Sequence, residues 1–99
     1  MTEHRKHPRA PISIPMAFEI EGGPRVEARC ADLSLGGMFI ETERPASYGT
    51  ALRIYARLPG CDAVIEAIVR WAKPTGMGVQ FGRTGARETH GITELLAQR

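Results

Sequence analysis

The sequence predicts an all-β fold with a C-terminal helix, in the form of a small six-stranded antiparallel β-barrel. Apolar residues alternate with polar ones over six short stretches, and Gly- and Pro-containing turns separate these stretches at short intervals. Only the tail of the chain changes to a helical period. Short strands at this spacing are typical of a small antiparallel barrel or sandwich. A chain of 99 residues forms one domain with one modest core.

The first two strands flank a Gly-rich turn. Residues 14–20 and 26–30 each alternate apolar and polar side chains, which is the period of a half-buried strand. Between them, residues 21–24 read Glu-Gly-Gly-Pro and form the turn. The apolar side of the second strand ends at Cys30.

Four further strands follow, and the pattern predicts them over residues 38–40, 52–58, 65–71 and 77–81. Within the fifth strand Trp71 is in phase with the apolar positions, so we expect it to pack in the core. Gly76 and Gly78 are assigned to the turn into the last strand.

The tail has the spacing of a helix. Ile92, Leu95 and Leu96 follow the i, i+3, i+4 rule and predict a helix over residues 86–97 that packs against the barrel. Gly91 within it costs about 1 kcal/mol relative to alanine. We therefore divide the single domain (1–99) into a flexible arm (1–11), a barrel (12–83) and the helix (86–97).

Charge and cysteine content exclude few functions. The net charge of +2 is compatible with an anionic partner but lower than a general nucleic-acid binder usually carries. No secretory signal and no stretch of about 20 apolar residues is present. We expect a cytoplasmic protein without membrane insertion, in which Cys30 and the turn residue Cys61 are inert, reduced thiols.

No pattern of an enzyme or a metal site is present. His4, His7 and His90 show none of the spacings that bind zinc, and no nucleophile or phosphate-loop motif occurs. We therefore expect no catalytic residues, no metal and no cofactor.

The arm carries a basic motif. Pro8 and Pro11 disfavour helix, so Arg5 and Arg9 lie in an extended segment, about 13 Å apart at 3.3 Å per residue, and point the same way. A guanidinium is a planar fork that matches phosphate oxygens or the O6 and N7 acceptors of guanine. A solvated terminus explains the same residues equally well.

A second motif follows the second strand, in the stretch ADLSLGGMFIE. Asp32 and Ser34 are two positions apart, so we expect their side chains to share a face. The carboxylate can accept from the paired N–H donors of guanine, and the hydroxyl can support it. Gly36 and Gly37 permit a tight reversal and leave backbone N–H groups open to a ligand. Taken alone, this pattern also fits a plain turn.

Together the two motifs resemble those of the PilZ domain, whose pattern is RxxxR followed by (D/N)xSxxG. Here they read Arg5-Lys6-His7-Pro8-Arg9 and Asp32-Leu33-Ser34-Leu35-Gly36-Gly37. The similarity continues through GMFIET, IVRWAK and GMGVQF and covers nearly the whole chain.

The resemblance implies a PilZ β-barrel that binds the bacterial second messenger cyclic di-GMP. Arg5 and Arg9 would contact guanine edges and phosphates. Asp32 and Ser34 would read the other guanine edge, and Gly37 would be the motif glycine. Four further residues are secondary candidates for the same ligand: His4, Lys6, Gly36 and Trp71.

One departure concerns the number of ligands. Many members that bind a stacked pair of ligand molecules carry another arginine just before RxxxR, whereas this chain has His4, which is not permanently charged. One or two ligand molecules per site therefore remain open.

The resemblance implies a receptor and adaptor, not an enzyme, that signals to an effector protein controlling motility, biofilm or exopolysaccharide. One alternative is a ligand-independent PilZ interaction adaptor, which the intact motifs disfavour. Another is a small-barrel binder of nucleic acid, which needs exposed aromatic residues for stacking. The alternation leaves only Tyr48 and Tyr55 exposed, so we expect no nucleic-acid polymer as partner.

Overall fold

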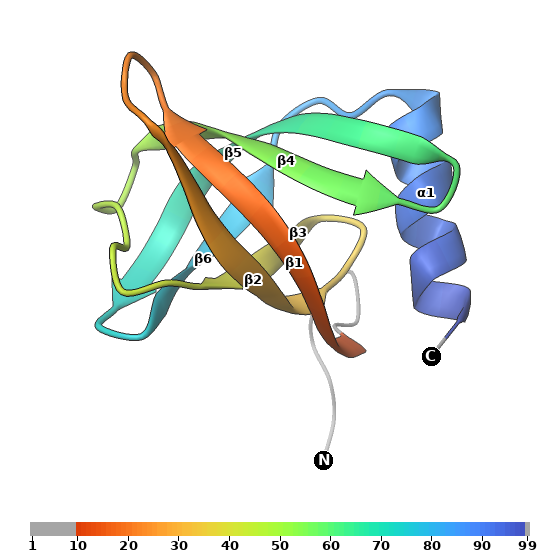
Figure 1. The fold of residues 1–99 in the computed structure, drawn as a ribbon, viewed down its shortest axis with the longest axis horizontal. Helices are drawn as coiled ribbons and strands as arrows, with labels where there is room; N and C mark the ends of the chain where they lie inside the picture. Colours follow the sequence, from red (N-terminus) through yellow and green to blue (C-terminus); the bar gives the residue numbers. More distant parts are fainter. Residues whose placement is uncertain (1–9, 99) are drawn as a thin grey trace.

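Six antiparallel strands form a closed barrel in the computed structural model, which describes residues 10–98 (Figure 1). The elements are β1 (Ala10–Ile20), β2 (Arg25–Leu33), β3 (Gly37–Glu41), β4 (Ala51–Leu58), β5 (Cys61–Lys73), β6 (Gly76–Phe81) and α1 (Ala86–Ala97). Around the barrel the order is β1-β2-β3-β6-β5-β4, and pairing of β1 with β4 closes it. The predicted six-stranded antiparallel barrel with a C-terminal helix is confirmed.

Alternation along the strands fills the barrel interior. In β4 and in the first nine residues of β5, every second side chain is buried and the others face solvent. The largest fully buried side chains include Phe18, Ile40, Ile54 and Ile65. Each such side chain contributes about 1.5–3 kcal/mol by leaving water. The core therefore lies inside the barrel, and the outer face is left for function.

Register shifts interrupt this alternation in three strands, and the one in β1 lies between Pro11 and Ile14. The other two lie in β2 and β5. The β2–β3 register passes from Cys30↔Ile40 to Asp32↔Phe39, so β2 contains one extra residue, Ala31. The β5–β6 register passes from Val69↔Val79 to Trp71↔Gly78, so β5 contains one extra residue, Arg70. An extra residue on one strand turns the residues beyond it to the opposite face. This effect positions the candidate site.

The expectation that Trp71 packs in the core is wrong. Beyond the bulge at Arg70 its side chain lies on the outer face of the barrel and is 45% exposed. Strict alternation from Val69 placed it inside because a bulge leaves no mark in the apolar period.

Two smaller expectations also need correction. The strand β1 begins at Ala10, so residues 10 and 11, assigned to the arm, belong to the barrel. Cys61 is the first residue of β5 and is not in the turn. Both cysteines are buried and free of a disulfide, as small apolar residues in a core are.

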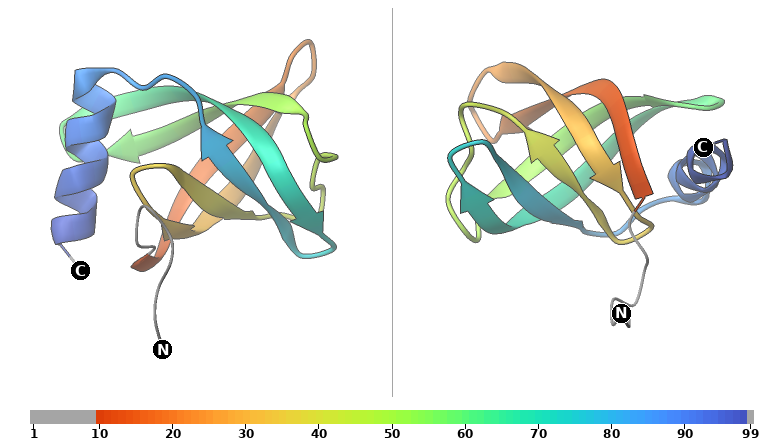
Figure 2. Two further views of the ribbon diagram at one scale, coloured as in Figure 1. Left: turned by 180° about the vertical axis from the view of Figure 1, so that it is seen from behind. Right: turned by 90° about the horizontal axis from the view of Figure 1, so that it is seen from below.

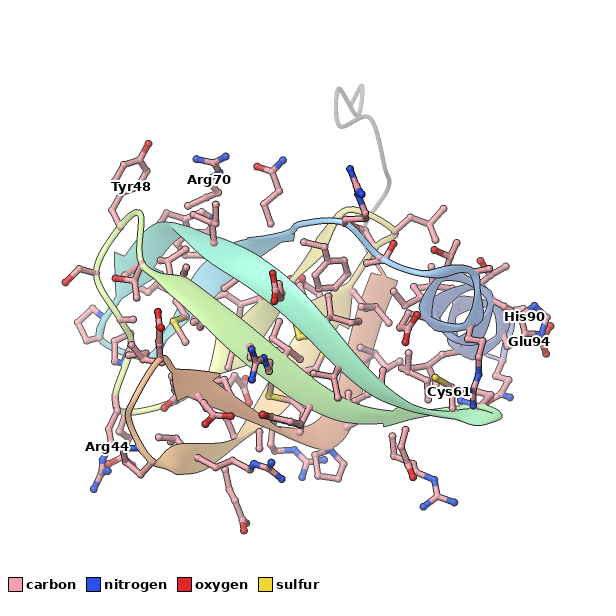
Figure 3. The ribbon with its side chains drawn as sticks, turned by 90° about the horizontal axis from the view of Figure 1, so that it is seen from above. Arg44, Tyr48, Cys61, Arg70, His90 and Glu94 are labelled. Atoms are coloured by element: carbon pink, nitrogen blue, oxygen red, sulfur yellow. The ribbon has the colours of Figure 1, made fainter. Side chains whose placement is uncertain are left out.

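The helix α1 packs on the hairpin of β4 and β5 at one end of the barrel (Figures 1 and 2). Gly91 and Ile92 face the barrel and are buried, whereas His90 and Glu94 point away from it (Figure 3). A Cβ at position 91 would lie 2.8 Å from Leu58 Cβ, so glycine allows the close approach. Within residues 10–98, no helix has the length and apolar character needed to cross a membrane.

Candidate functional site

Asp32 lies on the outer face of the barrel because of the bulge at Ala31. Without the bulge, Asp32 would follow Cys30 into the core. With it, Leu33 turns inward and is 1% exposed, while the half-buried Asp32 faces out. The Phe39 backbone N–H donates to Asp32 Oδ1 over 3.1 Å, which fixes the carboxylate at the end of β2. A fixed carboxylate on a surface can accept N–H donors of a ligand.

Ser34 lies in the turn itself, because β2 ends at Leu33. Ser34 is 3% exposed. Its Oγ accepts the backbone N–H groups of Gly36 and Gly37 over 3.1 and 3.2 Å. The Ser34 N–H in turn donates to the Gly37 carbonyl over 2.9 Å. These bonds satisfy the two glycine N–H groups that we expected to be open to a ligand.

Packing, and not backbone conformation, requires glycine at position 37. The φ of Gly37 is not positive, so any residue could adopt this backbone conformation. A Cβ at this position would lie 2.1 Å from the Val79 carbonyl oxygen of β6. The turn between β2 and β3 can therefore lie against β6 only with glycine here. Ser34 and Gly37 hold the turn in place. Together with the bulge at Ala31, they position the Asp32 carboxylate on the outer face of the barrel, where a ligand can reach it.

One row of residues crosses five strands at the level of Asp32. Strand pairing places Pro11 of β1 opposite Asp32, Asp32 opposite Phe39, Phe39 opposite Gly78, and Gly78 opposite Trp71. Residues directly opposite one another on neighbouring strands share a face. From Asp32 to Trp71 the row therefore forms a continuous surface, and the backbone of Pro11 pairs with its first residue.

Phe39 and Trp71 stack on this surface. Their ring centroids are 5.2 Å apart and their planes differ by 21°. The Lys73 ammonium lies 5.3 Å from the Phe39 ring and 5.7 Å from the Trp71 ring. Aromatic faces beside a cation form a surface suited to a flat, electron-rich ring with negative charge nearby.

Two glycines of β6 make room for these rings. A Cβ on Gly78 would lie 2.2 Å from Trp71 Nε1, and one on Gly76 would lie 2.6 Å from Phe39 Cζ. Both lie within β6, not in the turn to which the sequence assigned them. Sequence reasoning therefore missed Phe39 and Lys73, although the alternating glycines beside apolar residues could have indicated a ring packed across the strand.

The other aromatic residues differ in exposure. Tyr48 is exposed, as expected, and points away from the barrel beside Arg70 (Figure 3). Tyr55, expected to be exposed, is half-buried. Its hydroxyl donates to Glu19, and the Arg25 guanidinium lies 3.7 Å from its ring centroid. Trp71, expected to be buried, is a further exposed aromatic residue on which a nucleic-acid base could stack, so exposed aromatic residues disfavour a nucleic-acid binder less than expected.

The arm residues Arg5 and Arg9, with His4 and Lys6, lie outside the described residues. Their connection to the site is covalent: Arg9 directly precedes Ala10 in the chain, and Ala10 is opposite Leu33. Even fully extended, five residues span at most about 18 Å. The Cα of Arg5 is therefore never further than this from that of Ala10, where the arm joins the barrel next to Asp32.

Metal chemistry finds no support in the part of the chain that the structure describes. No three His, Cys, Asp or Glu side chains among residues 10–98 lie close enough together to hold an ion.

Solved structures with the same fold are similar to this chain at low sequence identity. The PilZ domain of CeSA from a cellulose-synthesizing bacterium matches at 23% identity and a TM-score of 0.72, over 88% of this chain and 92% of that one. The Bacillus subtilis inhibitor of motility MotI/DgrA matches at 20% and 0.75, over 99% and 52%. The Borreliella burgdorferi PlzA protein, solved in complex with c-di-GMP, matches at 17% and 0.75, over 92% and 40%.

At these identities the likeness shows the fold, and this chain spans about half or less of the length of the MotI/DgrA and PlzA chains. No curated protein sequence matches the chain significantly. The model of the PilZ domain matches residues 3–98, which is nearly the whole sequence and includes both motifs. The chain belongs to the PilZ domain family.

Proposed function

We propose that this protein is a receptor for cyclic di-GMP that works as a binding and adaptor domain. The observation that carries the proposal is the pairing of β1 with β2, because Pro11 lies opposite Asp32. The strand that follows the RxxxR arm therefore begins beside the carboxylate of the second motif. Two parts of the sequence, more than twenty residues apart, belong to one surface.

The chemistry of the two parts is complementary to one ligand. Cyclic di-GMP carries two guanine bases and two phosphates. The Asp32 carboxylate accepts from the paired N1–H and N2–H₂ donors of guanine, while Arg5 and Arg9 supply forks for the O6 and N7 edge and for phosphate. Lys6 adds a point charge, and His4 lies just before the motif. PlzA, a structural neighbour, was solved with this ligand.

The stacked pair of Phe39 and Trp71 extends this surface. The row that contains Asp32 continues through Phe39 to Trp71, so a base bound to the carboxylate lies near an aromatic face. Stacking of a base on an aromatic side chain is worth about 1–3 kcal/mol. The two rings therefore add affinity without adding charge.

We expect the signal to arise because one ligand molecule contacts both the arm and the barrel. The ligand would hold the arm against the barrel and create a composite surface that a second protein reads. The expected processes, motility, biofilm or exopolysaccharide, come from the family. MotI/DgrA, an inhibitor of motility, has this fold. We expect affinity to depend on the charge-assisted contacts of the arm.

Calorimetric titration tests the proposal and also gives the number of ligand molecules bound. We expect saturable binding of cyclic di-GMP, and no binding of cyclic di-AMP or GTP at the same concentrations. Asp32→Asn keeps an oxygen for the Phe39 N–H but removes the charge, so affinity should fall by about tenfold or more. Arg5→Ala and Arg9→Ala should have a similar effect.

Arg53→Ala is the matched control. Arg53 is an exposed arginine on β4, three strands away from β3 in either direction around the barrel. Its removal lowers the net charge by one, as Arg5→Ala and Arg9→Ala do, and should leave affinity unchanged. Absence of binding at tens of micromolar ligand would show that the protein is a ligand-independent adaptor. Equal affinity in the Asp32 and Arg53 variants would instead show that Asp32 takes no part in the site.

Fluorescence and gel-shift measurements distinguish a cyclic di-GMP receptor from a nucleic-acid binder. Trp71 is the only tryptophan, so cyclic di-GMP stacked near it should change the emission of the protein. A nucleic-acid binder would instead retard single-stranded RNA or DNA at moderate salt, and its affinity would decrease steeply as salt increases.

A further inference from the structure

One lysine of the barrel lies over the stacked rings of Phe39 and Trp71. Lys73 is two positions beyond Trp71 in the regular part of β5, so the two side chains share the outer face. The Lys73 ammonium lies 5.3 Å from the centroid of the Phe39 ring and 5.7 Å from that of the Trp71 ring. A cation within about 6 Å of an aromatic ring is attracted to its face. The rings therefore hold the ammonium near one place without neutralising its charge.

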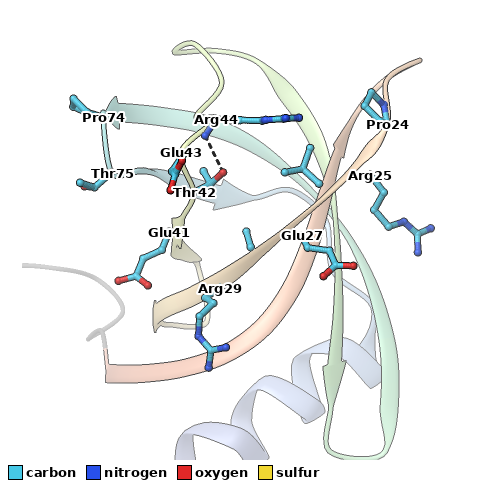
Figure 4. Close-up of a pocket in the computed structure, with 12 residues that line it drawn as sticks. Pro24, Arg25, Glu27, Arg29, Glu41, Thr42, Glu43, Arg44, Pro74 and Thr75 are labelled. Carbon is cyan, nitrogen blue, oxygen red and sulfur yellow. Dashed lines mark hydrogen bonds between the residues drawn. The ribbon is translucent and has the colours of Figure 1, made fainter.

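The carboxylate on the same row of the barrel does not neutralise Lys73 either. Strand pairing places Lys73 opposite Gly76, and Gly76 opposite Glu41, so Glu41 is two strand spacings, roughly 10 Å, away. Glu41 lines a groove of about 720 Å³ beside β2, and Lys73 does not (Figure 4). Within residues 10–98, Lys73 forms no ion pair. Its charge is therefore available to a ligand.

Lys73 and Asp32 both interact with Phe39. The Phe39 backbone N–H donates to Asp32 Oδ1 over 3.1 Å, and the ring of the same residue attracts Lys73. Asp32 belongs to β2 and Lys73 to β5, with β3 and β6 between them in the barrel. A carboxylate and an ammonium therefore lie on either side of one aromatic surface.

This order of groups matches the parts of a guanine nucleotide. A carboxylate accepts from the N–H donors of the base, an aromatic ring stacks on its face, and an ammonium binds phosphate as a point charge. One ribose joins the base of a nucleotide to its phosphate, so a cation beside a stacked base is close to the phosphate as well. The arm joins the barrel at Ala10, on the side of Asp32. Lys73 supplies a positive charge at the opposite end of the surface.

We propose that Lys73 binds a phosphate of the nucleotide, so that cations hold the ligand at both ends of the aromatic surface. This contact rests on the receptor function proposed above, and it lies outside both sequence motifs. The rings restrict the long side chain before the ligand binds, which lowers the conformational entropy lost on binding. The same rings leave the ammonium its charge, which a carboxylate partner would cancel.

Calorimetric titration of cyclic di-GMP against three variants tests the contact. Lys73→Gln keeps a hydrogen-bond donor but removes the charge, so affinity should fall about fivefold and should depend less on salt concentration. Lys73→Arg keeps the charge and should recover most of the affinity. The control Arg53→Gln removes an equal charge from the exposed face of β4 and should change neither affinity nor its salt dependence.

The lysine signals give a second measurement. The chain has only two lysines, Lys6 and Lys73, and reductive ¹³C-methylation labels both while keeping their positive charge. In the free protein the two rings should shift the methyl signal of Lys73 upfield, and Trp71→Leu should reduce this shift. Saturating cyclic di-GMP should move the same signal, which Lys73→Gln assigns by its loss.

The contact and the receptor function fail in different ways. If the wild-type protein binds, equal affinity and equal salt dependence in Lys73→Gln would overturn the phosphate contact and leave the receptor function intact. Equal losses in Lys73→Gln and Lys73→Arg would also overturn the contact, because the charge would then not matter. No binding by the wild-type protein would overturn both.

Discussion

At the scale of single residues, the residues of the second motif have two different roles. Asp32 is available to a ligand, whereas Ser34 and Gly37 stabilise the turn. Asp32 faces solvent and holds the Phe39 N–H, whereas Ser34 and Gly37 are buried in the turn. Ser34 accepts two backbone N–H groups there, which would otherwise lack a partner inside the turn. Substitutions at the supporting residues therefore affect stability first and ligand binding as a consequence.

Gly37→Ala tests this division. The new Cβ would lie 2.1 Å from the Val79 carbonyl oxygen, and because that atom is backbone, β3 or β6 must shift. We expect a loss of about 3 kcal/mol in the free energy of unfolding, measured by urea denaturation. Gly82→Ala is the control, since its Cβ meets the Glu66 carbonyl oxygen only at 3.4 Å. Equal stabilities of the two variants would show that the turn has room for a side chain.

At the scale of elements, the strands could be predicted from the sequence and the bulges could not. The period of alternating residues depends on which face of a strand is buried, and this is visible in the order of residues. A bulge depends on how two strands pair, so Ala31 and Arg70 look like ordinary strand residues. The inward-facing prediction for Trp71 was wrong for this reason.

In the helix α1, tertiary packing overrides the helix propensity of a single residue, Gly91. Gly91 disfavours a helix by about 1 kcal/mol, but in the structure it lets α1 approach Leu58 of the β4–β5 hairpin. Helix propensity concerns one segment, whereas this contact joins residues far apart in sequence. Ile92 packs next to it and could be identified from the apolar spacing, while the reason for the glycine could not.

Gly91→Ala should therefore destabilise the protein despite improving the helix. The added methyl group would lie 2.8 Å from Leu58 Cβ and 3.1 Å from its Cδ1. Overpacking of this kind costs about 1–3 kcal/mol, which exceeds the gain of about 1 kcal/mol in helix propensity. Thermal unfolding followed by circular dichroism measures the difference. In the exposed control Thr93→Ala the midpoint should rise slightly, and a rise in the Gly91 variant would mean that α1 is not held against the hairpin.

At the scale of the whole molecule, one ladder carries two surfaces. The β2–β3 ladder presents Asp32 at one end and leaves the edge of residues 25–28 open at the other. The closed barrel holds the two ends in a fixed relation, because every strand pairs on both sides over part of its length.

If the protein is the receptor proposed above, cyclic di-GMP binds the folded chain and not the unfolded one, so the ligand should stabilise the whole barrel. At a ligand concentration of 100 times Kd the gain is about 2.7 kcal/mol, which for a domain of this size raises the melting temperature by about 10 °C or more. Arg9→Ala, with affinity reduced about tenfold, should show about half this rise at the same concentration, because the gain depends on the logarithm of ligand over Kd. Differential scanning calorimetry measures both, each against its own ligand-free midpoint. An equal rise in the two proteins would mean that the ligand is held by the barrel alone, and the arm would then have no part in the receptor.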